Sequence, residues 1–75
     1  MAFDQAGFQV ECGKLVRIWR RRRDLSQQEL AWQLRMNRAT VANVEKGRQR
    51  VAADVLWRIS LVLKVPVKRL MPEPL

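Results

Sequence analysis

The 75 residues of this chain are enough for one small domain but not for two, because a chain this short buries only about 60% of its unfolded surface. Fifteen basic residues against seven acidic ones give a net charge of +8, which favours a polyanionic partner. One cysteine and no histidine exclude an internal disulfide and a typical zinc site. We therefore expect no metal and no cofactor, with self-association as the remaining source of extra stability.

The sequence carries no signal that would direct the chain to a membrane. No apolar run approaches the roughly 18 residues that indicate a membrane-spanning helix. The beginning of the chain lacks the basic start and the apolar stretch of a signal peptide. We therefore expect a cytoplasmic protein with no membrane partner.

The pattern divides the chain into three parts. The predicted parts are an N-terminal arm or extra turn (1–9), a helical domain (10–71) and an extended C-terminal tail (72–75). In the first part Asp4 is a possible helix cap, while Phe3 and Phe8 can close over the core or over a second copy. In the last part Pro72 and Pro74 hold the chain extended.

The first predicted helix, from Glu11 to Arg22, has one apolar face. Residues recurring at helical spacing form that face: Cys12, Leu15, Val16 and Trp19, with Ile18 at its edge. Cys12 is interpreted as a small core residue and not as a nucleophile, because no histidine is present to activate it. Four consecutive arginines, residues 20–23, wrap around the end of the helix, so they cannot all have the same role.

Two short helices separated by a tight turn are predicted within residues 25–46. Ser26 and Glu29 form a capping box, so a helix starts at Gln27. Its apolar stripe consists of Leu30, Ala31 and Leu34. Asn37 is an N-cap only three residues beyond this stripe, which leaves room for a turn alone.

The helix after Asn37 shows two faces when successive residues are placed about 100° apart. Val41 and Val44 form the inward face. The outward face consists of Arg38, Ala39, Ala42, Asn43 and Lys46. It combines hydrogen-bond donors with methyl groups that allow close approach, which suits a major groove. Gly47 is expected to end the helix.

The run LSQQELAWQLRMNRATVANVEKGR resembles the helix-turn-helix of the phage-repressor and Cro-like family of transcription regulators. The likeness extends from about Cys12 to Met71, because the flanking helices also have the family's spacing. It implies an all-α, compact five-helix lambda-repressor-like DNA-binding domain with a central helix-turn-helix. Arg35 and Asp24 stand where the family often has glycine. If the family turn is kept, Arg35 takes an unfavourable left-handed conformation, which Asp24 tolerates better.

The resemblance also implies roles for single residues. The expected base-contacting residues are Arg38, Ala39, Ala42 and Asn43, with Gln27 near the end of the half-site. The expected phosphate-contacting residues are Ser26, Thr40, Lys46, Arg48, Arg50, Arg22 and Arg23. Arg20 and Glu45 match a family ion pair between the first and third helices, and Glu45 lies close enough to the core face to need a partner.

The C-terminal third supplies the last helix and an apolar surplus. The helix is predicted from Ala52 to Leu63, with one buried face: Ala53, Leu56, Ile59, Ser60 and Leu63. Further apolar residues exceed what one face needs: Val55, Trp57, Leu61, Val62 and Val65. Pro66 can start a short helix over Val67–Met71, with Leu70 packed inward. The predicted dimer surface consists of Trp57, Leu61, Val67 and Met71.

These features predict a transcriptional regulator, a homodimeric (auto)repressor that binds a palindromic operator in double-stranded DNA. The alternative is a protein-interaction module of the same fold, such as an antitoxin that neutralises a partner toxin. In that case Trp32, expected to be half-exposed, and Trp57 would be the anchors. A regulator, by contrast, can repress by occupying a promoter or activate by touching RNA polymerase. An enzyme is not expected, since there is no catalytic residue pattern, no metal spacing and no glycine-rich phosphate loop.

Overall fold

The computed structural model describes residues 4–73, and every regular element within them is helical. The elements are α1 (Gln5–Arg22), α2 (Gln27–Leu34), α3 (Arg38–Glu45), α4 (Ala53–Leu63) and a short 3-10 helix, η1 (Val67–Leu70). The predicted all-α class is confirmed. The predicted count of five helices is slightly wrong, because the last element makes a 3-10 turn and not an α-helix.

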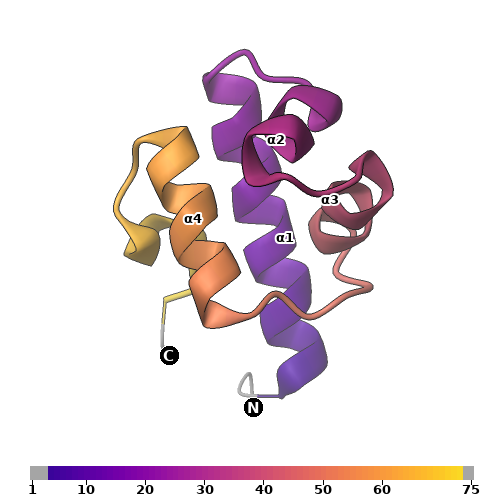
Figure 1. Cartoon of the computed structure of the whole chain (residues 1–75). Coiled ribbons are helices and arrows are strands. Elements are labelled where there is room, and N and C mark those ends of the chain that lie inside the picture. Colours follow the sequence, from indigo (N-terminus) through magenta and orange to yellow (C-terminus); the bar gives the residue numbers. More distant parts are fainter. Residues whose placement is uncertain (1–3, 74–75) are drawn as a thin grey trace.

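The long helix α1 runs through the centre of the molecule (Figure 1). The helices α3 and α4 lie on opposite sides of it, and α2 packs against both of them. The 3-10 helix packs against α1 and α4. The motif helices α2 and α3 are thereby supported from behind by the two longer helices.

The helix α1 begins at Gln5, six residues before the predicted start at Glu11. Asp4 explains the difference, because its carboxylate accepts a hydrogen bond from the Gly7 amide at 2.5 Å and caps the helix. Residues 5–9 are thus the first turns of α1 and not a free arm. The expected role of Phe3 and the conformation of Pro74 concern positions outside the described residues.

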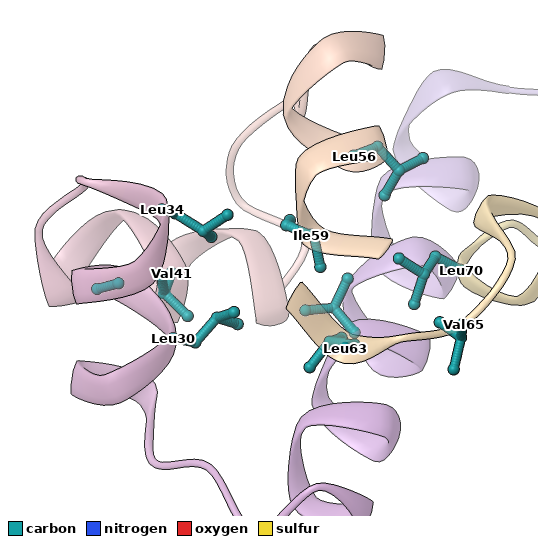
Figure 2. Close-up of a cluster of buried hydrophobic side chains, with 10 residues drawn as sticks. Leu30, Leu34, Val41, Leu56, Ile59, Leu63, Val65 and Leu70 are labelled. Carbon is teal, nitrogen blue, oxygen red and sulfur yellow. The ribbon is translucent and has the colours of Figure 1, made fainter. Parts of the chain in front are cut away.

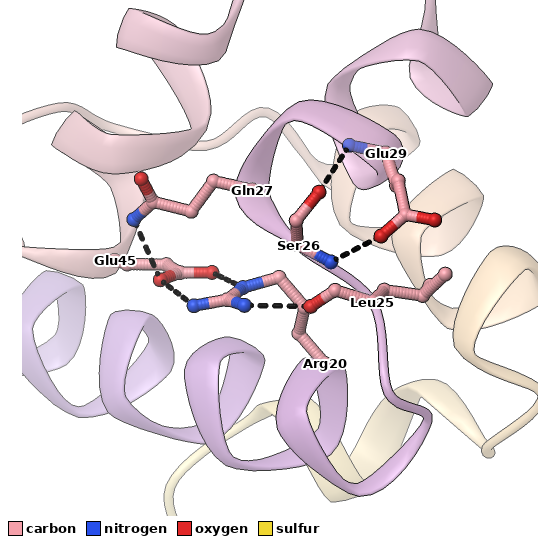
Figure 3. Close-up of polar contacts among 6 residues, drawn as sticks. All are labelled: Arg20, Leu25, Ser26, Gln27, Glu29 and Glu45. Carbon is pink, nitrogen blue, oxygen red and sulfur yellow. Dashed lines mark hydrogen bonds and ion pairs between the residues drawn. The ribbon is translucent and has the colours of Figure 1, made fainter.

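Side-chain caps start the two motif helices as predicted. The Glu29 amide donates to the Ser26 hydroxyl oxygen at 3.0 Å, and the Ser26 amide donates to the Glu29 carboxylate at 2.9 Å (Figure 3). The hydrogen bond from the Ser26 amide lowers the pKa of the Glu29 carboxyl. Asn37 caps α3, since its side-chain oxygen accepts from the Thr40 amide at 2.8 Å.

The hydrophobic core lies where the helices meet (Figure 2). Its fully buried large side chains are Val16, Leu30, Leu34, Leu63 and Leu70. The burial predicted for Leu70 is therefore confirmed. Cys12 is also buried, and burial raises the pKa of its thiol.

Two predictions for residues in and just after the last helix are wrong. Ala53 is exposed in the first turn of α4, whereas Val51 and Val55 on either side of it pack against the core. Val65 is buried and so does not belong to the predicted apolar surplus. Lys64 takes a left-handed conformation with φ 57°, which ends α4 and turns Val65 back toward the core.

Positive φ values mark the ends of helices elsewhere in the chain. Arg35 has φ 57° and Asp24 has φ 55°, the conformations expected if the family turn is kept. Gly47 has φ 73° directly after Lys46, the C-cap of α3, as its C′ position requires. Among residues 4–73, no helix combines the length and the apolar character needed to cross a membrane.

Candidate nucleic-acid interface

The helix α3 separates a buried side from an outward side. Val41 and Val44 are 4% and 5% exposed and pack into the core. On the outward side Arg38, Ala39 and Lys46 are exposed, while Ala42 and Asn43 are half-buried. The four α3 residues predicted to contact bases therefore share one outward side of a helix whose other side is fixed by packing.

The end of α3 lies directly against the backbone of α1 at Gly13. A Cβ atom added to Gly13 would overlap the carbonyl oxygens of Val44 and Glu45, lying 2.7 Å from the latter. Any side chain here would push the end of α3 away from α1. Gly13 could not be identified from the sequence, because a glycine within a helical pattern does not reveal which segment approaches it.

A buried ion pair joins the same two helices (Figure 3). Arg20 Nε donates to Glu45 Oε2 at 2.6 Å, and Arg20 Nη2 donates to Glu45 Oε1 at 3.0 Å. The remaining nitrogen, Nη1, donates to the Leu25 carbonyl at 2.7 Å, directly before the start of α2. One guanidinium thus ties the end of α3 and the beginning of α2 to α1. Both charged residues are 7% exposed, so the pair is largely shielded from water.

Gln27 belongs to this network. Its Nε2 donates to Glu45 Oε1 at 3.1 Å, and the side chain is half-buried in the first turn of α2 (Figure 3). Glu45 therefore restricts the orientation of the amide that was predicted to lie near the end of a half-site. This hydrogen bond was not predicted, because Gln27 and Glu45 are 18 residues apart in the sequence.

The expected phosphate-contacting residues of the motif lie around α2 and α3. Ser26 is exposed at the start of α2, and the half-buried Thr40 donates its hydroxyl hydrogen to Asn37 Oδ1 at 2.9 Å. Lys46, Arg48 and Arg50 are exposed at and beyond the end of α3. The start of this loop is fixed where Gln9 Nε2 donates to the Gly47 carbonyl at 3.2 Å.

Arg22 and Arg23 have other partners than those predicted. Arg23 Nε donates to the Leu63 carbonyl at 2.6 Å and so caps the end of α4. The Arg22 and Arg23 guanidinium carbons lie 4.8 and 5.4 Å from the centre of the Trp19 ring. Both guanidinium groups thus have partners within the protein, and the function proposed below leaves them out of the phosphate-contacting set. The sequence alone could not show that Arg22 and Arg23 lie on the side of α1 that carries Trp19 and faces the end of α4.

Large apolar side chains are exposed at several positions away from the outward side of α3. Those in the predicted dimer surface are Trp57 at 55%, Leu61 at 57%, Val67 at 36% and Met71 at 39% exposure. Trp32, on α2, is 68% exposed and so more accessible than the half-exposure expected for it.

A family model described as helix-turn-helix (HTH_3) matches residues 16–70, most of the chain and all of the motif. The chain belongs to this helix-turn-helix family of transcription regulators. The family resemblance inferred from the motif is thereby confirmed. Comparison with curated proteins gives no match.

Solved structures share the arrangement of this helix-turn-helix domain. The restriction-modification controller protein C.AhdI from Aeromonas hydrophila is 27% identical with a TM-score of 0.84, over 89% of this chain and 97% of its own. The hypothetical transcription factor NHTF from Neisseria is 26% identical with a TM-score of 0.83, over 99% of this chain and 85% of its own.

The same helix-turn-helix arrangement also occurs inside a larger protein. The hydroxypropylphosphonic acid epoxidase from S. wedmorenis is 26% identical with a TM-score of 0.82 over 87% of this chain. This chain spans only 35% of the length of that enzyme. The likeness therefore concerns one part of the epoxidase and carries no enzymatic activity to this chain.

Proposed function

We propose that this chain is a sequence-specific regulator of transcription that binds double-stranded DNA. The observation that carries the proposal is the outward side of α3, accessible in a helix that Gly13 and the Arg20–Glu45 pair hold against α1. A rigid helix with exposed donors on one side fits a major groove. Membership of a family of transcription regulators supports the same function.

Side-chain chemistry assigns the contacts within this proposal. Arg38 would donate two hydrogen bonds to guanine, and Asn43 would pair with the edge of adenine. Ala39 and Ala42 would contact thymine methyl groups, while Gln27, oriented by Glu45, would lie near the end of the half-site. The exposed cations Lys46, Arg48 and Arg50, with Ser26 and Thr40, would hold phosphates, which position the protein without reading sequence.

Two protomers would act together as a homodimeric (auto)repressor on a palindromic operator. The exposed apolar residues Trp57, Leu61, Val67 and Met71 support a dimer surface in the C-terminal third. Two-fold symmetry then predicts half-site centres about 10 base pairs apart.

Selection of bound duplexes from a random library, followed by affinity measurements at two salt concentrations, tests the proposal. Recovery of a palindrome with a steep salt dependence is the expected result. If no motif emerges and binding simply vanishes as salt rises, net charge alone accounts for DNA binding, and the proposed function is wrong.

Sedimentation of the Trp57→Ala protein tests the dimer surface. Truncation of this side chain should shift the protein toward monomer, because a large exposed apolar group is removed from the proposed contact. Trp32→Ala is a matched control, since it removes an exposed tryptophan from α2. A Trp57→Ala protein that remains dimeric would place the interface elsewhere.

The exposure of Trp32 favours one second candidate function. A tryptophan that is 68% exposed on α2 would anchor a partner protein, such as a toxin. The outward side of α3 separates the two proposals, because an interaction module has no need of Arg38 and Asn43. A relaxed sequence preference in Arg38→Ala therefore argues for the regulator.

A further inference from the structure

The helix α1 carries a second group of cations that the helix-turn-helix motif does not include. Arg17 and Arg21 are exposed, and they lie four residues apart, so they share one side of the helix. No carboxylate among residues 4–73 forms an ion pair with either of them. Their charges are therefore available to an external anion.

The side of α1 that carries these arginines is the side that meets α3. Val10, Gly13, Arg17 and Arg21 follow one another at steps of three and four residues, which forms a single ridge along the helix. Gly13 lies against the end of α3. Val10 lies against Gly47, because a Cβ atom added to Gly47 would be 2.8 Å from the Val10 Cα. The ridge thus continues from the contact with α3 to Arg17 and Arg21.

The far end of the ridge lies close to the start of α2. Arg20, the neighbour of Arg21, donates to the Leu25 carbonyl and to Glu45, which in turn accepts from Gln27. The two exposed arginines therefore border the corner where the end of α3 meets the beginning of α2. In the proposed complex, both of these helix ends face DNA.

The other arginines of α1 are placed differently. Arg22 packs against Trp19. Both residues line one groove together with Lys68 and Arg69 of η1. Arg23 is hydrogen bonded to the end of α4. The attraction of a helix C-terminus for cations could account for a charge at position 21, but Arg17 lies a full turn earlier than the last-turn arginines.

We infer that Arg17 and Arg21 form a second phosphate-binding site, on α1, that holds the DNA backbone beside the start of α2. The inference rests on the proposed function, and it extends the contact surface beyond the helix-turn-helix motif. Arginine suits this role because its guanidinium forms paired hydrogen bonds with phosphate oxygens. The contacts add affinity and orientation without reading sequence.

The test compares neighbouring arginines in the intact protein bound to its selected duplex. Arg21→Gln and Arg22→Gln remove the same charge from the same end of α1, so they change the long-range field almost equally. Arg21→Gln should reduce the slope of log affinity against log salt by about 0.9 for each protomer bound, and Arg17→Gln should do the same. Arg22→Gln should leave the slope unchanged.

Neutral methylphosphonate linkages, introduced one at a time into the duplex, locate the contact. When a phosphate held by the site is neutralised, the duplex should bind the native protein more weakly. The same duplex should bind the Arg17→Gln, Arg21→Gln double variant as tightly as the unmodified duplex does. Equal losses for Arg21→Gln and Arg22→Gln, or no loss for either, would overturn the inference. Failure of the native protein to select any duplex would instead reject the proposed function. Circular dichroism verifies that each variant is folded.

Discussion

The helices α3 and α4 both pack against α1, but contacts of different kinds hold them. At α3 the contact is close and polar: the backbone meets Gly13, and Glu45 pairs with Arg20. At α4 it is mainly apolar, through side chains such as Leu63, and Arg23 is added at the end of the helix. Apolar packing stabilises without fixing direction, whereas an ion pair with a close backbone contact allows one orientation. The helix proposed to enter DNA is the one that is oriented most strictly.

The largest expected effects come from two variants that distinguish the orientation of α3 from the stability of the fold. Glu45→Ala leaves Arg20 buried without its partner and should cost about 3–5 kcal/mol of unfolding free energy. Leu63→Ala creates a cavity in the α4 half and should cost about 2–5 kcal/mol. At a temperature where both variants stay folded, only Glu45→Ala should lose operator affinity. Denaturant melts and binding titrations measure the two quantities, and equal affinity losses would contradict the contrast between α3 and α4.

A smaller change tests the close contact itself. Gly13→Ala should lower the unfolding free energy by about 1–3 kcal/mol, because the new methyl group meets backbone oxygens that cannot move without α3. It should also weaken operator binding by displacing α3. Gly7→Ala is the control on the same helix, since its new methyl group would meet only the side chain of Asp4. Similar losses in the two variants would show that helix flexibility, and not the contact, is responsible.

Capping and patterning could be predicted from the sequence because they depend on residues three or four positions apart. Two contacts are of this kind: the pair of hydrogen bonds between Ser26 and Glu29, and the bond from the Thr40 amide to Asn37. The close approach at Gly13 and the cap formed by Arg23 could not be predicted, because their partners come from helices far along the chain. A pattern shows that a residue is buried or capping, but the folded chain decides which neighbour it meets.

Base contacts and phosphate contacts should also differ in their effects. Arg38→Ala should relax sequence preference by about 1–3 kcal/mol at one base position, because a paired contact to guanine is lost. Arg48→Ala should weaken all duplexes about equally and reduce the salt slope by roughly one unit. Affinities for operator variants at two salt concentrations measure both effects. If the two variants behave alike, the division into base and phosphate contacts is wrong.

The smallest expected effect concerns the turn between α2 and α3. Arg35 holds a left-handed conformation that glycine adopts without steric cost, so Arg35→Gly should raise the unfolding free energy by up to about 1 kcal/mol. Asp24→Gly should gain less, because aspartate tolerates this conformation better. Thermal melts measure both changes. A destabilised Arg35→Gly protein would mean that the arginine side chain stabilises the turn.

The three tryptophans also make the protein its own optical probe, since it contains no tyrosine. Trp19 lies half-buried beside two guanidinium groups, whereas Trp32 and Trp57 face solvent on different helices. The emission of Trp19 should therefore follow unfolding, that of Trp57 self-association, and that of Trp32 the arrival of a partner on α2. Proteins retaining one tryptophan each would report these three events separately and without a label.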